Sequence, residues 1–229
     1  MISVITVCLN SSETIRLTLK SVLDQNIDHY EHIVIDGGSH DGTLEIVNEY
    51  ARDNLILVNE KDDGIYDAIN KGIQLAKGDI IAILNSDDFY VDNNVLNDIS
   101  SMFQSNPKRD CLLSEVIFYK EPNVHKVIRH YGVCLFRPNL LRIGLMPPHP
   151  GSFFRKDIYT KYGLYNKEYK ICGDFDFFVR VLLKNKISFV KLKRVTVNMR
   201  SGGVSTSGLK SFIKITKECN HSLISNGYF

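Results

Sequence analysis

Short runs rich in β-branched residues alternate with longer amphipathic patterns along the first hundred residues. The short runs have the length of buried strands, and the longer patterns repeat their apolar positions at helical spacing. The expected strands are residues 2–8, 32–35, 54–58 and 79–84, and the expected helices are residues 14–25, 43–52 and 65–76. Because helices separate successive strands, we expect an α/β fold with a mostly parallel, Rossmann-like central sheet flanked by helices. Its ligand site should lie at the carboxyl ends of the strands.

The pattern loosens after residue 103. The expected elements are strands at 111–119 and 124–131, a proline-rich turn at 146–150, an apolar run at 151–154, a helix at 174–183, strands within 187–199 and a last amphipathic helix at about 209–224. Gly202-Gly203 would be a flexible joint before the last helix. The pattern in this half of the chain therefore predicts an extension of the sheet that mixes parallel and antiparallel strands.

Polar side chains follow three of the expected strands. Asn10 and Asp36 each come directly after a strand, and Asp87 and Asp88 follow the apolar run that ends at Leu84. An uncompensated pair of acids beside a buried sheet is costly, whereas a divalent cation with phosphate oxygens uses such a pair as ligands. The alternative is that one acid caps the helix expected near residue 93. Because the strand ends meet at one crevice, the pattern favours metal-assisted nucleotide chemistry.

Two other segments carry candidate binding residues. The glycine-rich turn at 35–43 exposes backbone amides, and Asp36 at its start is placed to accept hydrogen bonds from a base or ribose. On the helix expected at 65–76, the polar residues Asp67, Asn70 and Lys71 share one face. Apolar residues occupy the other face, at Ile65, Ala68, Ile69 and Ile73. The polar stripe could line the nucleotide crevice, with Lys71 near a phosphate, or form an ordinary solvated helix face.

Composition and charge narrow the class of protein. The chain has 229 residues, 44% of them hydrophobic and 24% charged, which fits one globular domain. Residues 1–100 carry 6 Lys or Arg and 18 Asp or Glu, whereas the remaining residues carry 22 and 8. The acidic half could hold a cation. The basic half could meet phosphates or an anionic membrane surface, or simply be solvated; its cluster is Lys191, Lys193, Arg194, Arg200, Lys210, Lys214 and Lys217.

Cysteine usage and hydropathy bear on the compartment. Five cysteines are scattered without a Cys-x-x-Cys spacing, so the sequence suggests neither a disulfide framework nor a zinc site. No stretch reaches the roughly 18 apolar residues of a membrane-spanning helix, and a signal peptide is not evident. We therefore expect a cytoplasmic protein whose membrane contact, if it has one, is peripheral at the inner membrane.

The ordered motifs of the chain resemble family 2 glycosyltransferases, over residues 2 to about 206. The early motifs are Ser3-Val4-Ile5-Thr6-Val7-Cys8-Leu9-Asn10, Asp36-Gly37-Gly38-Ser39-x-Asp41-Gly42-Thr43, Asp63-Gly64-Ile65-Tyr66-Asp67-Ala68-Ile69-Asn70-Lys71-Gly72 and Leu84-Asn85-Ser86-Asp87-Asp88. The later ones resemble bacterial members that build surface polysaccharides: His149-Pro150-Gly151-x-Phe153-Phe154-Arg155, Gly173-Asp174-Phe175-Asp176-x-x-x-Arg180 and Gly202-Gly203-Val204-Ser205. The last helix lies beyond the resemblance.

The resemblance implies a single GT-A domain over 1–229 that transfers a sugar from a nucleotide-diphosphate sugar with inversion at the anomeric carbon. Residues 1–103 would form the nucleotide-sugar half, 104–206 an acceptor-side extension with the catalytic base, and 207–229 the last helix. UDP is the nucleotide that family habit favours. The acceptor would be lipid-linked or an oligosaccharide, in O-antigen, capsule or exopolysaccharide synthesis.

The resemblance also assigns roles to residues. Asp36 would read the base, Asp174 would be the catalytic base, and Asp87 with Asp88 would hold Mn²⁺ or Mg²⁺ and the diphosphate. Asn85 stands where many members have another acid. The donor-binding set is Cys8, Asn10, Asp36, Asp67, Asn70, Lys71, Ser86 and Asp87. A carboxylate that takes the hydroxyl proton and a cation that neutralises the leaving group suit this reaction. Asp174 opens a helix, whose dipole should keep it ionised.

Two further features allow more than one interpretation. His149 could face the acceptor or the metal, or be a packed, hydrogen-bonded histidine. Asp176 and Arg180 are four residues apart on the expected helix and could pair across its surface, which is a structural role.

Other functions fit the sequence less well. A catalytically inactive nucleotide-binding or scaffold relative would have no use for Asp87, Asp88 and Asp174 together. A sugar-phosphate nucleotidyltransferase would need a glycine-rich basic loop, which residues 7–12 lack. Dehydrogenase and P-loop motifs are absent, and the basic residues lack the interleaved aromatics of a nucleic-acid site. The oligomeric state is not indicated.

Overall fold

The computed structural model describes residues 1–120, 123–202 and 209–228. Residues 203–205 of the last motif, including the second glycine of the expected joint, lie outside these ranges.

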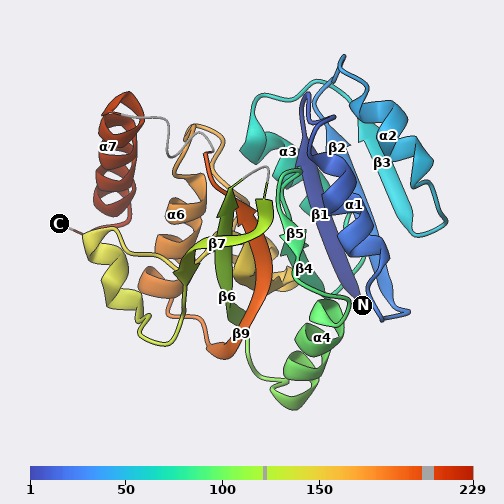
Figure 1. Cartoon of the computed structure of the whole chain (residues 1–229). Helices are drawn as coiled ribbons and strands as arrows, with labels where there is room; N and C mark the ends of the chain where they lie inside the picture. The colour runs from blue at the N-terminus through green and yellow to red at the C-terminus, as the bar shows by residue number, and fades with distance from the viewer. Residues whose placement is uncertain (121–122, 203–208, 229) are drawn as a thin grey trace.

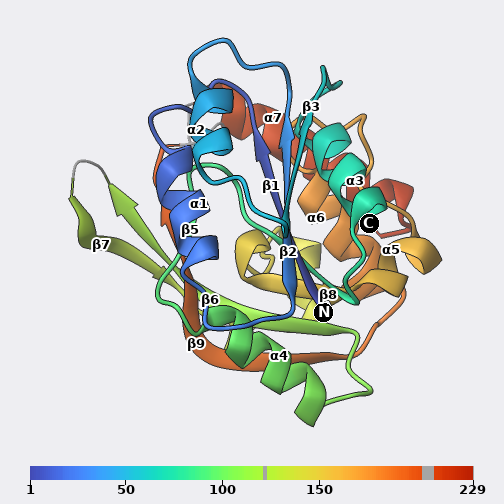
Figure 2. The ribbon, with the colours of Figure 1, turned by 90° about the vertical axis from the view of Figure 1, so that its right-hand side faces the viewer.

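Parallel strands form the amino-terminal half of the sheet in the order β3-β2-β1-β4 (Figure 1). The strands are β1 (Ile2–Cys8), β2 (Tyr30–Asp36), β3 (Leu55–Asn59) and β4 (Ile80–Ile83). The connecting helices are α1 (Ile15–Leu23), α2 (Thr43–Glu49) and α3 (Ile65–Leu75). Figure 2 shows α1 and α2 on one side of β1 and β2, and α3 on the other. The parallel register and the two helical layers confirm what the sequence pattern predicts for this half.

A mixed extension continues the sheet from β4 in the order β8-β6-β9-β5, and β7 pairs with β6. Its strands are β5 (Phe89–Tyr90), β6 (Cys111–Lys120), β7 (Asn123–Tyr131), β8 (Ser152–Arg155) and β9 (Phe189–Arg200). Its helices are α4 (Val95–Ser105), α5 (Lys156–Tyr162), α6 (Gly173–Phe178) and α7 (Leu209–Ser225). Short 3₁₀ turns cover Pro138–Ile143 and His149–Gly151. Only the β6–β9 pair is parallel among these described strand pairs, because β8, β5 and β7 all run antiparallel to their neighbours.

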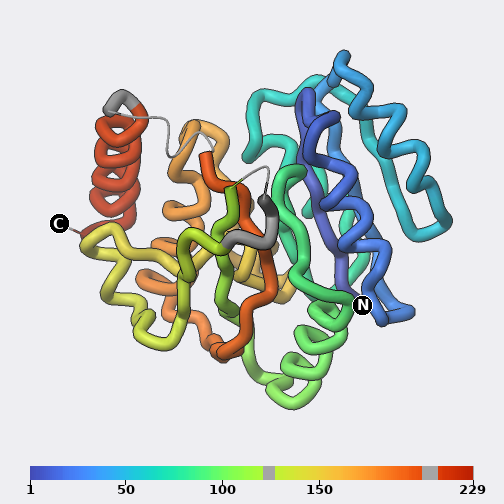
Figure 3. Tube along the Cα trace, in the orientation of Figure 1, coloured from blue at the N-terminus to red at the C-terminus, as the bar shows by residue number. Residues whose placement is uncertain are grey.

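The largest apolar cluster lies between the sheet and a layer that combines α3 with helices of the second half. All seven residues of β1 are buried, as expected for a strand covered on both faces. On the side of α6, Phe154 of β8 packs edge-to-face on Phe177, with ring centroids 5.1 Å apart. The tube in Figure 3 shows α7 on the side of the molecule away from the blue amino-terminal helices. There α7 packs on α6, which ties the last helix to the second half of the sheet.

Three local features differ from the sequence expectation. On α3, Ile65 is 45% exposed and Asn70 is buried, so the apolar and polar faces are not divided as expected. The reason is that Asn70 exchanges two hydrogen bonds with the backbone of Tyr165, which satisfies its amide. The helix expected at 174–183 is α6 followed by a π-helical turn at Val179–Lys184. The helix α5 and the 3₁₀ turn at Pro138–Ile143 were not expected.

Candidate active site

A cleft of about 1250 Å³ opens at the carboxyl ends of the amino-terminal strands and extends to α6 and α7. The first half of the chain contributes the ends of β1 and β4, and the second half contributes the turn at His149 and the start of α6. The predicted site residues that line it are Cys8, Asn10, Ser86, Asp87, Asp88 and Asp174. The remaining predicted site residues do not line it; these are Asp36, Asp67, Asn70 and Lys71.

Asp36 is buried at the end of β2, beside the cleft, where its carboxylate organises the glycine-rich turn. It accepts hydrogen bonds from the backbone N–H groups of Gly38 and Ser39 at 3.0 and 2.8 Å, and from the Ser39 hydroxyl at 2.6 Å. The Cys8 thiol lies 3.4 Å away, and burial together with this carboxylate raises the thiol pKa. Asp36 therefore has a structural role, and its contact with a base stays a prediction.

The polar residues of α3 contact other parts of the protein. Asp67 accepts from the Lys167 ammonium at 2.9 Å, and Lys71 pairs with Glu60 at 2.9 Å. Asn70 is held by the backbone of Tyr165. These contacts join α3 to neighbouring loops. The expected contacts of the three side chains with a nucleotide stay predictions.

The acid pair lies where β4 ends, and neither acid caps the following helix. Helix α4 begins at Val95 with Asn94 as its cap residue, so the capping alternative is wrong. Asp88 is buried and accepts a hydrogen bond from the Arg200 N–H at 3.1 Å. Burial, and then the charge of Asp87, raise the pKa of Asp88 well above its ordinary value. The fold thus keeps a carboxyl where burial and a neighbouring negative charge disfavour its ionised form.

The donor atoms beside this pair fit a hard divalent cation. The Asn85 amide nitrogen lies 3.4 Å from Asp88 Oδ2, and the Asn85 Oδ1 is buried without a hydrogen-bond partner among the described residues. Carboxylate and amide oxygens are the ligands that Mg²⁺ and Mn²⁺ prefer. No cluster of three His, Cys, Asp or Glu side chains able to hold a metal occurs in the described part of the chain. A cation here would therefore need further oxygens from phosphate or water.

Asp174 stands across the cleft, at the first turn of α6. Its Oδ1 accepts from the Phe175 N–H at 2.7 Å. The Tyr66 hydroxyl lies 3.4 Å from the same oxygen and shares its single proton between this carboxylate and the Ile171 carbonyl, which is 2.5 Å away. Burial raises the pKa of this carboxyl, and the neighbouring His149 and the two hydrogen bonds oppose the rise. The net direction is upward, because desolvation raises the pKa more than these contacts lower it. The expectation that Asp174 is ionised at the start of the helix stays a prediction.

His149 is a packed, hydrogen-bonded histidine, which is one of the interpretations that its sequence context allowed; its contact with an acceptor or a metal stays a prediction. Its Nε2 is 2.9 Å from the Tyr165 hydroxyl, and its ring packs edge-on against Tyr165 and Phe178. It also lines the cleft. Burial lowers its pKa, and the charge of Asp174 works in the opposite direction.

Sequence reasoning missed two cleft residues. Tyr66 donates to the Ile171 carbonyl at 2.5 Å and stacks on Tyr165, so it links α3 to the segment before Asp174. Asp62 lines the cleft after β3 and accepts from the Gly64 N–H at 2.9 Å. An acid at the end of a third parallel strand was the available signal for Asp62. The partner of Tyr66 lies more than a hundred residues away, so no local pattern could reveal it.

The basic cluster of the final third is divided among different contacts. The Lys191 ammonium donates to the carbonyls of Cys134 and Phe136 at 2.9 and 2.7 Å. Arg194 pairs with Asp92 and Asp98. Arg200 lines the cleft, and the side chain of Lys210 lies outside the described residues. No helix in the described part of the chain is long and apolar enough to cross a membrane.

Comparisons with known proteins agree with this geometry. In sequence, a PGL/p-HBAD biosynthesis glycosyltransferase of Mycobacterium bovis is 28% identical over 183 residues, which cover 79% of this chain and 69% of that protein. A putative teichuronic acid biosynthesis glycosyltransferase of Bacillus subtilis, TuaG, is 35% identical over 117 residues, covering 50% of this chain and 45% of that protein.

Solved structures show the same fold. TarS of S. aureus, residues 1–349 with UDP-GlcNAc, matches with a TM-score of 0.74 at 18% identity, covering 98% of this chain and 72% of that one. The chain spans 43% of a longer TarS structure. The mannosyltransferase PcManGT of Pyrobaculum calidifontis, with GDP-Man and Mn²⁺, matches with a TM-score of 0.69 at 17% identity, covering 98% of this chain and 63% of that one. The fold is therefore GT-A, as the resemblance implies.

The family described as Glycosyl transferase family 2 matches residues 3–173. This stretch contains the acid pair, the His149 turn and the start of α6, and it covers well over half of the chain. The protein therefore belongs to glycosyl transferase family 2.

Proposed function

We propose that the protein is an inverting glycosyltransferase that uses a nucleotide-diphosphate sugar, with UDP as the nucleotide, in bacterial surface-polysaccharide synthesis. The observation that carries the proposal is the shared cleft, which the acid pair and Asp174 line from the two halves of the chain. A leaving diphosphate and an acceptor hydroxyl require these two kinds of group. The names of the mycobacterial and Bacillus relatives, which refer to PGL/p-HBAD and teichuronic acid biosynthesis, support a role in the synthesis of surface glycans. The acceptor in this proposal is lipid-linked or an oligosaccharide.

In the proposed reaction, Asp174 accepts the proton of the acceptor hydroxyl. The hydroxyl oxygen forms a bond to the anomeric carbon while the bond from that carbon to the diphosphate oxygen breaks, and the nucleoside diphosphate departs with the electron pair. Displacement from the opposite face inverts the anomeric centre. The Phe175 N–H and the Tyr66 hydroxyl orient the Asp174 carboxylate for this proton transfer.

The proposal includes a divalent cation held by Asp87 and Asp88, with Asn85 Oδ1 as a further oxygen donor. When bound, Mn²⁺ or Mg²⁺ would neutralise charge on the departing diphosphate. Support comes from the buried Asn85 Oδ1, which has no hydrogen-bond partner within the described ranges, and from the Mn²⁺ bound to PcManGT.

The alternatives have less support. Family membership and the GT-A fold argue against a sugar-phosphate nucleotidyltransferase. An inactive scaffold would gain nothing from placing Asp87, Asp88 and Asp174 on one cleft, where burial of Asp88 and Asp174 is unfavourable. Peripheral contact with the inner membrane stays a prediction, and Lys191 and Arg194 contribute little to it because protein groups already bind them.

Thermal unfolding with nucleotide sugars tests the proposed function. UDP-GlcNAc, UDP-glucose and GDP-mannose are added with and without Mn²⁺, and one donor should raise the unfolding midpoint only with the metal. A ligand at 100 times its Kd stabilises the fold by about 2.7 kcal/mol. Asp87→Ala should lose the shift. The control Asp79→Ala should keep it, because Asp79 is 77% exposed and pairs with the amino terminus. No shift with any donor, or a full shift in Asp87→Ala, would contradict the proposal.

A further inference from the structure

Helix α7 lies beyond the family match, which ends at residue 173, yet it forms part of the cleft wall. Its residues Ile215 and Cys219 line the cleft beside Asp174. The helix is therefore in a position to act on the site, although the motifs of the family assign it no role.

One carboxylate of α7 binds the segment that leads into Asp174. Glu218 Oε2 accepts hydrogen bonds from the N–H groups of Ile171 and Cys172, both at 2.9 Å, and Oε1 accepts from the N–H of Lys170 at 3.2 Å. The Glu218 side chain is 15% exposed. Three successive backbone donors thus converge on one partly buried carboxylate, immediately before α6 begins at Gly173.

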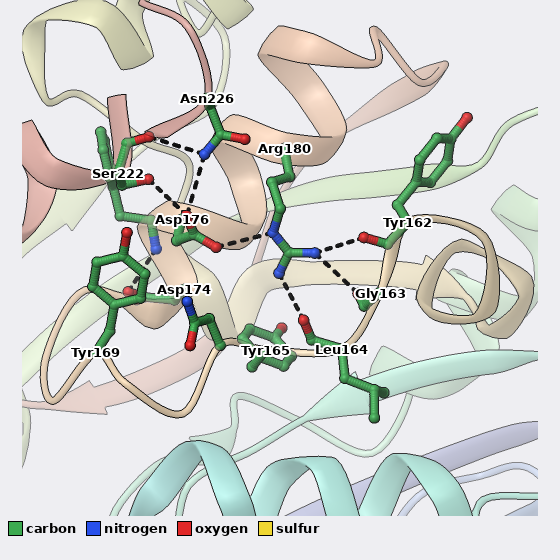
Figure 4. Close-up of polar contacts among 12 residues, drawn as sticks. Tyr162, Gly163, Leu164, Tyr165, Tyr169, Asp174, Asp176, Arg180, Ser222 and Asn226 are labelled. Carbon is green, nitrogen blue, oxygen red and sulfur yellow. Dashed lines mark hydrogen bonds and ion pairs between the residues drawn. The ribbon is translucent and has the colours of Figure 1, made fainter. Parts of the chain in front are cut away.

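Other contacts tie the same helix to both sides of Asp174. Before it, the Tyr169 hydroxyl is 3.0 Å from His221 Nδ1. After it, Asp176 Oδ1 accepts from the Ser222 hydroxyl of α7 at 2.9 Å, and from the amide of Asn226, just beyond the end of α7, at 3.3 Å, as the dashed lines in Figure 4 show. Helix α7 therefore contacts the chain on both sides of Asp174, and Glu218 binds the residues of this segment that line the cleft.

Gly173 leaves the Asp174 turn little room to find another arrangement. A Cβ at Gly173 would lie 2.7 Å from the ring of Tyr66, so the turn packs directly on this ring. The Ile171 residue bridges both contacts, because its N–H donates to Glu218 and its carbonyl accepts from the Tyr66 hydroxyl. Without the Glu218 carboxylate, the N–H groups of residues 170–172 would lose their acceptors. The Ile171 carbonyl would still bind Tyr66, but the backbone that leads into Asp174 would be less restrained.

We propose that Glu218 is a positioning residue for the transfer reaction: its carboxylate fixes the backbone of residues 170–172 so that Asp174 faces the cleft. This inference rests on the proposed function, in which Asp174 is the catalytic base. Glu218 acts through its oxygen atoms as hydrogen-bond acceptors. The length of the side chain, which brings these oxygens to the backbone, therefore matters more than its negative charge. The reacting groups need alignment to a fraction of an ångström, and a misplacement of about 1 Å costs about 100-fold in rate.

The test compares substitutions of similar size at Glu218. Glu218→Met keeps the volume and the helix propensity without an acceptor, whereas Glu218→Gln keeps one oxygen that can accept from Ile171 and Cys172. Glu168→Met is the control, because Glu168 is an exposed acid of the same segment. The readouts are amide hydrogen exchange of residues 170–172 by mass spectrometry, and kcat and donor KM from UDP release with the UDP-sugar of largest thermal shift.

Glu218→Met should speed exchange at residues 170–172 and lower kcat by about 10- to 100-fold, with the donor KM within about twofold of wild type. Glu218→Gln should restore most of the protection and stay within about threefold of wild-type kcat. The control should match the wild type. A purely structural role would lower the midpoint of unfolding without this split between kcat and KM. Unchanged hydrogen exchange at residues 170–172 in Glu218→Met would overturn the inference. This readout does not depend on turnover, so it applies even if none of the tested sugars is a substrate.

Two further comparisons remove ambiguity. If Glu218→Met does not fold, Glu218→Gln is compared with Glu218→Asp. Gln keeps the side-chain length, so it should give slower hydrogen exchange at residues 170–172 and a higher kcat than Asp. The reverse order would overturn the inference. Asp174→Asn is assayed beside them. If it turns over normally, the proposed base is wrong and the positioning role falls with it. If it is inactive while Glu218→Met resembles wild type in exchange and kcat, only the positioning role is wrong.

Discussion

The Asp174 carboxylate lies between groups that move its pKa in opposite directions. Burial raises the pKa above the ordinary 3.8, and His149, the Phe175 N–H and the Tyr66 hydroxyl hold the rise in check. A general base works best when its pKa approaches the operating pH while the group stays deprotonated. The environment of Asp174 suits that requirement better than a solvated aspartate would.

The pH dependence of turnover follows from this shift. Only deprotonated Asp174 can accept a proton, so kcat/KM should fall as pH falls through its raised pKa. Tyr66→Phe removes a donor to the ionised form, which raises the pKa further and should move this acidic limb to higher pH. The measurement is kcat/KM across pH for both proteins. An acidic limb at the ordinary aspartate value of about 4 would contradict the assignment.

The acids at strand ends could be found from sequence alone, but their partners could not. Asp87 and Asp88 are recognisable in the sequence because two adjacent acids follow the apolar run that ends at Leu84. The contacts of Asp36 and Asn70 depend on how the turn and the neighbouring loop fold over them, so a polar side chain expected to meet a ligand meets the backbone instead. The sequence periodicity carries no information about such long-range contacts.

At the scale of elements, β1 to β4 and the helices between them were predictable from the sequence. In each of these segments the apolar residues follow one clear pattern, that of a buried strand or of an amphipathic helix. The α6 segment is different. Its apolar run fits a single helix, but the chain passes into a π-helical turn at Val179–Lys184, where the Asn185 N–H bonds to the Arg180 carbonyl. Arg180 meanwhile pairs with Asp176, as the four-residue spacing predicted, although this pair is largely buried.

Arg180 should be a main source of stability for this region. Its guanidinium donates to Asp176 at 2.9 Å and to the carbonyls of Tyr162 and Leu164 at 2.6 and 2.7 Å (Figure 4). Arg180→Met leaves the Asp176 charge without its cation and should lower the free energy of unfolding by about 3–5 kcal/mol in urea titrations.

The matched control is Lys20→Met, which breaks another pair of the same spacing, Lys20 with Asp24, on an exposed face. It should change the free energy of unfolding little, because solvent screens exposed pairs. Equal losses in the two variants would contradict the structural role of Arg180.

At the scale of the whole molecule, the two halves of the chain contribute different groups to one cleft. The acidic first half supplies the Asp87–Asp88 pair, and the second half supplies His149, Asp174 and the α7 wall. The division of the chain into a donor half, an acceptor half and a last helix stays a prediction. It implies that donor binding and proton transfer can be lost separately.

Asp174→Asn tests the central claim most directly, because the substitution keeps size and polarity but removes the base. Donor affinity is measured by calorimetry, and turnover by release of nucleoside diphosphate in the presence of acceptor. We predict that donor affinity stays within about threefold of wild type while turnover falls by at least about 100-fold. Near-normal turnover by Asp174→Asn, with the donor bound, would show that Asp174 is not the base and would contradict the account.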